Sequence, residues 1–268
     1  MKTLKFSTLL VALASVFTFS SCLNDDDNDY GNVFRSYVTI SGDNLFGYTF
    51  YSDFGCKLIP DPTSVQTILP GLANSSAKRA IVAFELIGDE TTTQLKAGET
   101  YHVNLVNDYY ANYALPTFSS INTDNQPAAT DSLTTKNKGQ ISYVNSNIWA
   151  INGYVNAEMN IMYGGNTQPF YMHTYYDATD VDVANNTLTL KLYYNSNTTN
   201  SYTQAQSVFS FDLPDEIYSQ QFSKDTINLV LKARTNNTGS FDLIGDAEMN
   251  EVGRCKVALK DFLQPMPY

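Results

Sequence analysis

The chain has 268 residues, and its 16 Lys and Arg against 27 Asp and Glu give a formal net charge of −11. This acidic balance, without any basic cluster, excludes nucleic acid as a partner, because phosphate binding needs a basic footprint. The 19 Tyr and 15 Phe, with only 16% charged residues, are typical of strands rather than helices. The length allows one large or two small domains with proper cores.

The N-terminus has the pattern of a secretory signal peptide. Lys2 and Lys5 precede an apolar run over residues 6–19, which is shorter than the roughly 20 residues that a membrane-spanning helix needs. The small residues Ser20 and Ser21 then lead to Cys22. We therefore predict that residues 1–21 are removed.

Residues 19–22 resemble the lipobox that lipoprotein signal peptidase reads, although Phe19 replaces the usual Leu and Ser21 the usual Gly or Ala. This resemblance implies that Cys22 becomes the acylated first residue of the mature protein, carrying chains such as palmitate. Each buried methylene contributes about 0.8 kcal/mol, so several chains hold a domain on a membrane. The alternative is ordinary cleavage beside an incidental cysteine.

An acidic segment, residues 22–32, follows the anchor and is predicted to be a tether. Its aspartates Asp25, Asp26 and Asp27 resemble the export signal that sends lipoproteins of Bacteroidota to the outer face of the outer membrane. We therefore expect an outer-membrane protein that faces the cell exterior. A block of like charges is also typical of a plain solvated spacer, and both interpretations can hold together.

Short strands are predicted in the first half of the chain, around residues 37–40, 48–51, 80–87 and 101–106. They define a first β domain at 33–115. From about residue 113 the chain becomes rich in Pro, Thr, Ser, Asn and Asp, which indicates a long loop, and we assign 116–140 as a polar connection.

The second half shows apolar residues at every other position, the period of an antiparallel strand with one solvated face. The runs of this pattern are Val155 to Tyr163, Leu188 to Tyr194, Phe209 to Leu213 and Ile227 to Ala233. Turn-forming Asn and Gly residues separate them. Short strands at regular intervals, separated by turn-forming residues, predict a sandwich or barrel, and we assign a second β domain to 141–268. No stretch shows clear helical periodicity.

Two cysteines remain besides the anchor, Cys56 and Cys255. A disulfide between them is chemically permitted outside the cytoplasm. We favour two buried thiols in separate cores, because Cys255 alternates with Val257 and Leu259 as a core residue does.

The search for catalytic or metal-binding groups finds no convincing constellation. His102 and His173 lie in alternating strands without a carboxylate, Cys or second His nearby, and strand-surface positions explain them better than a metal site. Asp177, Asp180 and Asp182 could offer oxygens to Ca²⁺, but they lack the order of a known calcium loop and suit a polar turn. We expect no enzyme, no metal and no cofactor.

The aromatic residues suggest a binding surface. Tyrosines are paired at 109–110, 175–176 and 193–194, and Trp149 is the single tryptophan. Neighbouring strand residues point to opposite faces, so we expect one exposed tyrosine in each pair, able to stack on a sugar ring or a protein partner. The plainer interpretation is that Tyr simply favours strands.

Two short motifs, Asp131-Ser132-Leu133 and Asp225-Thr226-Ile227, resemble the acceptor of the periplasmic O-glycosylation system of Bacteroidota. Ser132 lies in the polar connection, and Thr226 opens a strand with its side chain expected to point away from the core. We predict glycan on Ser132 and on Thr226.

The whole chain resembles the NigD-like family of Bacteroidota lipoproteins. The resemblance rests on the signal peptide and SCL at 21–23 before the acidic run, and on RAIVAFE at 79–85, GDE at 88–90, YHVNLVNDY at 101–109, IW at 148–149, YVNAEMN at 154–160, YGG at 163–165, LKLYYNSN at 190–197 and VFSFDL at 208–213. It implies an all-β protein with a small OB-like N-terminal barrel and a C-terminal antiparallel β-sandwich. It implies no established activity and no functional residues; the family name comes from a bacteriocin operon, where an immunity role was proposed.

These observations favour a noncatalytic, surface-exposed outer-membrane lipoprotein with a binding or interaction role, such as bacteriocin immunity. It would contact the membrane through its lipid and a protein or glycan through its surface. The alternative function is a glycan-binding lipoprotein of an outer-membrane uptake system.

Overall fold

The computed structural model describes residues 33–43, 47–70, 77–88, 94–125, 141–163, 170–195, 203–214, 222, 226–235 and 249–258. All of them belong to one compact unit, Asn32–Tyr268. No helix within the described ranges is long and apolar enough to cross a membrane.

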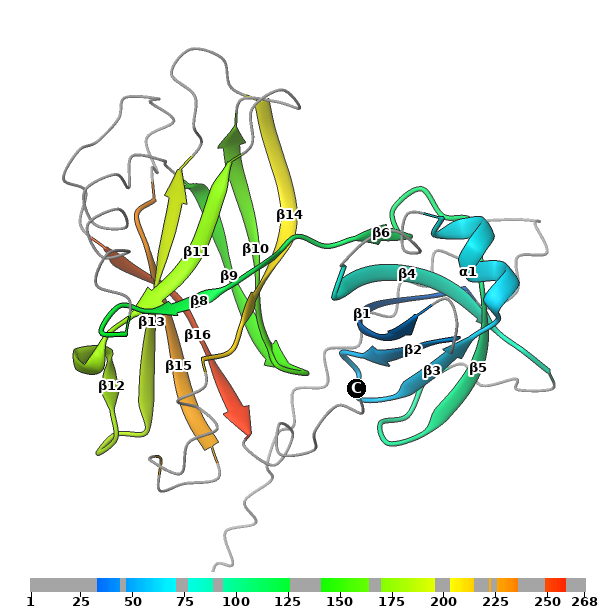
Figure 1. The fold of residues 1–268 in the computed structure, drawn as a ribbon, viewed down its shortest axis with the longest axis horizontal. Coiled ribbons are helices and arrows are strands. Elements are labelled where there is room, and N and C mark those ends of the chain that lie inside the picture. Colours follow the sequence, from blue (N-terminus) through cyan, green and yellow to red (C-terminus); the bar gives the residue numbers. More distant parts are fainter. Residues whose placement is uncertain are drawn as a thin grey trace, which may run out of the picture. The chain divides into compact units, whose positions relative to one another are not determined.

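The N-terminal part is a closed barrel of five strands (Figure 1). The strands β1 (Phe34–Asp43), β2 (Gly47–Ser52), β3 (Lys57–Pro60), β5 (Thr100–Leu105) and β4 (Arg79–Leu86) follow one another in this order, and β4 pairs with β1 to close the barrel. The β3–β5 pair is parallel and the other four are antiparallel. This order, with a helix between β3 and β4, is the OB-like barrel that the resemblance implied.

The barrel interior holds one apolar cluster. Its fully buried members include Val38, Phe50, Leu58, Val82 and Phe84. Helix α1 (Pro62–Ile68) adds Val65 to this cluster. This helix was not predicted, because its sequence shows no helical periodicity. Its N-terminal signal was nevertheless present: Asp61 accepts hydrogen bonds from the first-turn amides, and Pro62 is the first helical residue.

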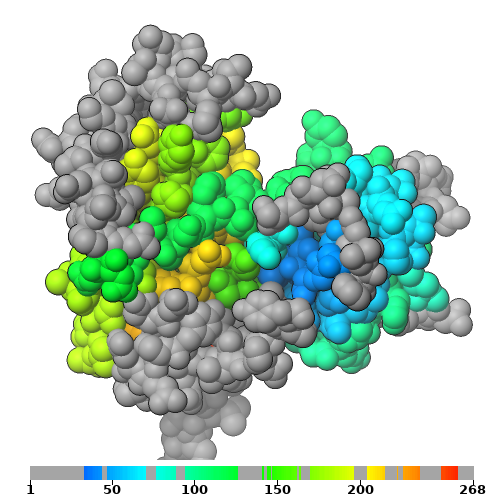
Figure 2. Space-filling model, in the orientation of Figure 1, coloured from blue at the N-terminus to red at the C-terminus, as the bar shows by residue number. Residues whose placement is uncertain are grey.

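Residues 113–122 were expected to lie in a polar loop, and they instead form three short strands that we call the strap. Within it, β6 (Tyr113–Ala114) pairs with β4, β7 (Thr117–Phe118) with β14, and β8 (Ser120–Asn122) with β11. The strap runs over the surface of this face of the molecule (green in Figure 2). Ten residues are thus bonded in turn to the barrel and to both sheets of the C-terminal part.

The C-terminal part is a sandwich of two sheets (Figure 1). One sheet has the order β7, β14 (Thr203–Asp212), β10 (Tyr154–Tyr163) and β9 (Ile141–Ile151). The other has the order β16 (Asn250–Ala258), β15 (Thr226–Ala233), β13 (Thr187–Asn195), β11 (Tyr171–Tyr176) and β8, with β12 (Val181–Asp182) beside β13 and a 3₁₀ helix at Ala178–Asp180. Most long pairs are antiparallel, and β13–β15 is parallel.

The sandwich core confirms the alternating runs of the sequence. The four inward residues of β15, Ile227, Leu229, Leu231 and Ala233, are completely buried. Equivalent inward positions on β10, β13 and β14 join them in one cluster between the sheets. The all-β architecture, with a small barrel before a sandwich, is therefore as predicted.

Candidate functional site

Several predicted sites fall outside the described residues. These are the lipidation site Cys22, the aspartates Asp25, Asp26 and Asp27, and Ser132. Thr226 is described: it is the first residue of β15 and is partly exposed.

The two histidines lie apart. His102 is exposed on β5. His173 is half-buried on β11, stacks on Tyr193 with ring centroids 6.4 Å apart, and has a pKa below its ordinary value because burial penalises the charged ring. The described residues contain no group of three His, Cys, Asp or Glu side chains placed to hold a metal ion.

The three aspartates considered for calcium each have a structural partner. Asp177 caps the 3₁₀ helix by accepting hydrogen bonds from the backbone N–H and hydroxyl of Thr179. Asp180 lies 2.6 Å from Nζ of Lys191. Asp182 accepts from the amide side chain of Asn185 at 2.7 Å. These turn and ion-pair roles support the polar-turn interpretation.

The cysteines are both free thiols, as favoured from the sequence, but only Cys56 is buried as expected and Cys255 is partly exposed. Cys56 is buried in the barrel core, whereas Cys255 packs against the sandwich core. Burial raises the pKa of the Cys255 thiol to about 12, so the thiol stays protonated at neutral pH.

The tyrosine pairs do not behave alike. Tyr175, Tyr176, Tyr193 and Tyr194 are all buried, so the expectation of one exposed tyrosine in each pair is wrong for two pairs. The outward-facing Tyr175 and Tyr193 are covered because they pack together with Ile121 of the strap and with Met249. Only the pair at 109–110 is exposed.

This pair lies in the tyrosine loop, which we define as residues 108–112 after β5. The side chains of Tyr109 and Tyr110 are 91% and 68% exposed and meet edge to face, with ring centroids 5.1 Å apart. Two exposed aromatic rings in contact present a broad apolar surface together with two hydroxyl groups.

The tyrosine loop is held firmly on the barrel. Nε of Arg35 on β1 donates to Asp108 Oδ2 at 2.7 Å, and the backbone N–H of Tyr110 donates to Asp108 Oδ1 at 2.8 Å. The guanidinium of Arg35 also lies over the Tyr110 ring, 5.8 Å from its centroid. Burial acts to raise the pKa of Asp108, but its hydrogen bonds and the Arg35 charge leave it below the ordinary value.

The loop ends on a residue that fixes its path. Asn112 has a φ of 66°, a left-handed conformation that Asn tolerates well. Its side chain donates to the Val106 carbonyl at 2.7 Å and accepts from the Ala83 backbone N–H at 3.0 Å. The two tyrosine rings are therefore presented on a pre-organised support.

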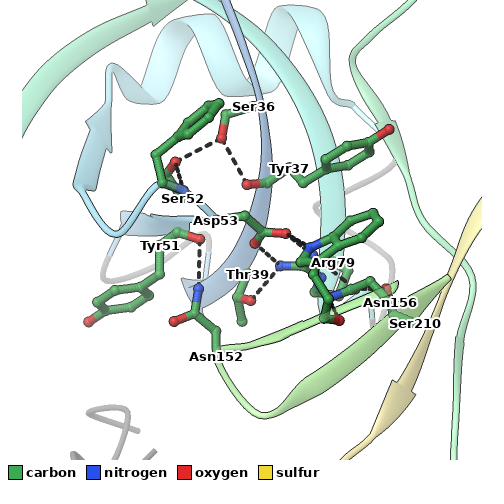
Figure 3. Close-up of polar contacts among 12 residues, drawn as sticks. Ser36, Tyr37, Thr39, Tyr51, Ser52, Asp53, Arg79, Asn152, Asn156 and Ser210 are labelled. Carbon is green, nitrogen blue, oxygen red and sulfur yellow. Dashed lines mark hydrogen bonds and ion pairs between the residues drawn. The ribbon is translucent and has the colours of Figure 1, made fainter. Parts of the chain in front are cut away.

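A second polar cluster lies where the barrel meets the sandwich (Figure 3). Its centre is the ion pair between Arg79, the first residue of β4, and Asp53, in the turn between β2 and β3. The guanidinium donates twice, from Nη1 to Oδ1 at 2.6 Å and from Nη2 to Oδ2 at 2.7 Å. The Arg79 side chain is completely buried, and that of Asp53 is 10% exposed.

Both members of this pair also bond residues of the sandwich. Nη2 of Arg79 donates to Asn156 Oδ1 on β10 at 3.0 Å, and Nε1 of Trp149 on β9 donates to Asp53 Oδ2 at 2.7 Å. Ser210 on β14 completes the set by donating to Asn156 Oδ1 at 2.7 Å. We call these five residues, with Thr39, the barrel–sandwich joint; Thr39 accepts from Nη1 of Arg79 at 2.9 Å.

Further contacts surround the joint. Tyr37 of β1 packs on Trp149 with ring centroids 5.5 Å apart, and burial raises its pKa to about 12. Asn152, in the turn between β9 and β10, donates to the Tyr51 carbonyl at 3.3 Å. The Arg79 guanidinium lies over the Tyr154 ring, 5.7 Å from its centroid. The boundary between barrel and sandwich therefore contains apolar, polar and charged contacts together.

The chemistry of the joint is that of a structural contact. All four terminal N–H groups of Arg79 have acceptors, and Asp53 accepts from two partners, so the charges are already engaged within the fold. No sequence spacing pointed to this cluster, although a basic residue opening the apolar run 79–84 and the single tryptophan were its visible signals.

Comparisons with known proteins agree with the fold. Residues 122–243 match the family model described as NigD-like C-terminal beta sandwich domain. A search of curated proteins found no match.

Three solved structures illustrate the likeness along most of the chain. A protein of Parabacteroides distasonis provisionally named as toxin-related is 20% identical, with a TM-score of 0.56 over 86% of this chain and 96% of that one. A protein of Bacteroides fragilis provisionally named a lipoprotein is 13% identical, with a TM-score of 0.53 over 85% and 98%. A NigD-like immunity protein of Bacteroides caccae is 18% identical, with a TM-score of 0.52 over 84% and 93%. At these identities the likeness shows the fold.

Proposed function

We propose that this chain, whose residues 122–243 match the NigD-like C-terminal beta sandwich domain, is a noncatalytic lipoprotein of the outer membrane, facing the cell exterior, that recognises a protein partner in an immunity-like role. The anchor rests on Cys22 and the lipobox-like residues before it. The name of the Bacteroides fragilis structure supports a lipoprotein, and that of the Bacteroides caccae structure supports immunity.

The tyrosine loop is the observation that carries the binding role. Tyr and Arg are among the residues that most often supply binding energy at protein interfaces, and here Tyr109, Tyr110 and Arg35 form one exposed group. Because Asp108 and Asn112 already fix the loop, a partner would pay little conformational entropy to order it.

The geometry favours a protein over a glycan at this surface. A sugar site usually presents aromatic faces that converge in one shallow hollow. The rings of Tyr109 and Tyr110 stand nearly perpendicular, at 88°, and one side of Tyr110 faces the Arg35 guanidinium. Another exposed tyrosine, Tyr171, belongs to β11 of the sandwich.

A protection assay tests this function. The gene is deleted in the native host, and the mutant is grown with competing Bacteroidota isolates that secrete antibacterial proteins. Complementation with the wild type should restore growth, whereas Tyr109→Ala/Tyr110→Ala should not. Tyr171→Ala, which removes a tyrosine of similar exposure on the sandwich, is the matched control and should protect like the wild type.

Two outcomes would count against the proposal. Equal protection by the double variant, at equal surface abundance, removes the tyrosine loop from the binding role. A deletion strain that grows like its parent against every isolate, but fails on a specific polysaccharide, supports the glycan-uptake alternative instead.

A further inference from the structure

We propose that the barrel–sandwich joint is an electrostatic latch that selects a single docked arrangement of barrel and sandwich and makes the two unfold together. This inference is independent of the proposed function. It rests on how the bonds of one buried ion pair are divided between the two parts of the chain (Figure 3).

Neither part of the chain can satisfy the ion pair alone. Within the barrel, Arg79 has Thr39 and Asp53, and its remaining terminal N–H reaches Asn156 of the sandwich. Asp53 likewise needs the indole N–H of Trp149. An arrangement that is docked but shifted would keep these polar groups buried without their partners, so correct docking and satisfaction of the charges are coupled.

The burial of the pair makes errors in docking costly. Asn156 and Ser210 are 0% exposed, as is Arg79. A charge in such surroundings that loses its partner is strongly destabilising, whereas sliding apolar surfaces past each other costs little. The joint therefore discriminates against shifted arrangements more sharply than the apolar contact of Tyr37 with Trp149 could.

The backbone of the strap reinforces the same two residues. The N–H of Leu115 donates to the Arg79 carbonyl at 2.9 Å, and the carbonyl of the next residue, Pro116, accepts from the Ser210 N–H at 3.0 Å. The side chains of Arg79 and Ser210 in turn share one acceptor, Asn156 Oδ1. Main chain and side chains thus define the same alignment.

Trp149 makes the latch directly measurable, because it is the only tryptophan of the chain. In the full mature chain, its fluorescence and its quenching by acrylamide report the joint, while far-ultraviolet circular dichroism reports all strands. For the wild type we expect the two signals to change at the same urea concentration. Exposure of Trp149 at clearly lower urea than the loss of strands would overturn the proposal.

The first variant is Asp53→Asn, which keeps the shape but removes the counter-charge of Arg79. The ratio of docked to undocked molecules should fall by at least about 100-fold, the effect of removing one partner of a buried pair. Trp149 should then become quenchable at urea concentrations that leave the strands intact. Asp108→Asn, the same substitution in the surface pair with Arg35, is the control and should not change Trp149.

A second variant covers the case in which Asp53→Asn does not fold. Arg79→Lys keeps the charge but cannot donate to Thr39, Asp53 and Asn156 together. Arg79→Lys should also make Trp149 quenchable at urea concentrations that leave the strands intact, but to a smaller extent than Asp53→Asn. If either folded variant retains the wild-type quenching profile, the latch is excluded.

Discussion

The indole N–H of Trp149, on β9 of the sandwich, donates to the carboxylate of Asp53 across 2.7 Å, although 96 positions separate the two residues. Trp149→Phe would keep most of the ring and delete this donor. A hydrogen bond to a charged group contributes about 1.5–3 kcal/mol, and we expect a loss in this range in the free energy of unfolding. Urea unfolding followed by circular dichroism measures it; a loss below about 0.5 kcal/mol would show that the bond contributes little.

The surface pair of Arg35 and Asp108 should make stability depend on acid pH. The pKa of Asp108 is lowered in the fold, so its contribution is present above the unfolded-state pKa and disappears as the pH falls through the folded-state pKa. The difference in melting temperature between wild type and Asp108→Asn should therefore shrink below about pH 4. A difference that stays constant between pH 7 and pH 3 contradicts this assignment.

The lipid anchor predicts a clean separation of folding from attachment. Cys22→Ala should leave the circular dichroism spectrum unchanged and move the protein from the membrane fraction to the soluble fraction, because acyl chains provide the attachment. Fractionation and immunoblotting of the native host give the answer. Recovery of the variant in the outer membrane at its original level would disprove the anchor.

The aspartates of the tether can be tested separately from lipidation. Changing Asp25, Asp26 and Asp27 to Ala should preserve acylation and lower the amount of protein exposed to protease on intact cells, if these residues are an export signal. Cys22→Ala serves as the unanchored reference. Unchanged protease accessibility would leave only the spacer interpretation.

Glycosylation is expected at Ser132 and at Thr226. Ser132 lies in the polar connection, and Thr226 is partly exposed at the start of β15, where its backbone is already paired with Ala258 of β16. Intact-mass measurement of protein from the native host, with Ser132→Ala and Thr226→Ala for comparison, tests each site. A mature mass explained by polypeptide and lipid alone excludes both.

Alternation of apolar residues was sufficient to predict β10, β13, β14 and β15, because each inward residue depends only on the two-residue period of its own segment. Ile227, Leu229, Leu231 and Ala233 show this, since all four are completely buried. The pairing of strands was not predictable in the same way. The parallel contact of β13 with β15 depends on residues distant in the sequence and leaves no local pattern.

The short helix and the polar contacts of the joint could not be predicted from the sequence, for related reasons. Helix α1 has seven residues and buries only Val65, too few to show a helical period. The joint brings together Asp53, Arg79 and Trp149 from three separate segments, and no local spacing encodes that meeting. The tyrosine pairs were misjudged because the covering of Tyr175 and Tyr193 by Ile121 depends on the strap.

Two adjacent strap residues bear on how this architecture can be recombined, because the Leu115 N–H donates to the Arg79 carbonyl and the Pro116 carbonyl accepts from the Ser210 N–H. A chimera that joins the barrel to an unrelated sandwich would lose the hydrogen bond from Ser210 to Pro116. A chimera that joins the sandwich to a foreign barrel would lose the hydrogen bond from Leu115 to Arg79. The unit that can be exchanged intact between genes is therefore the barrel, strap and sandwich together, despite the presence of two separate cores.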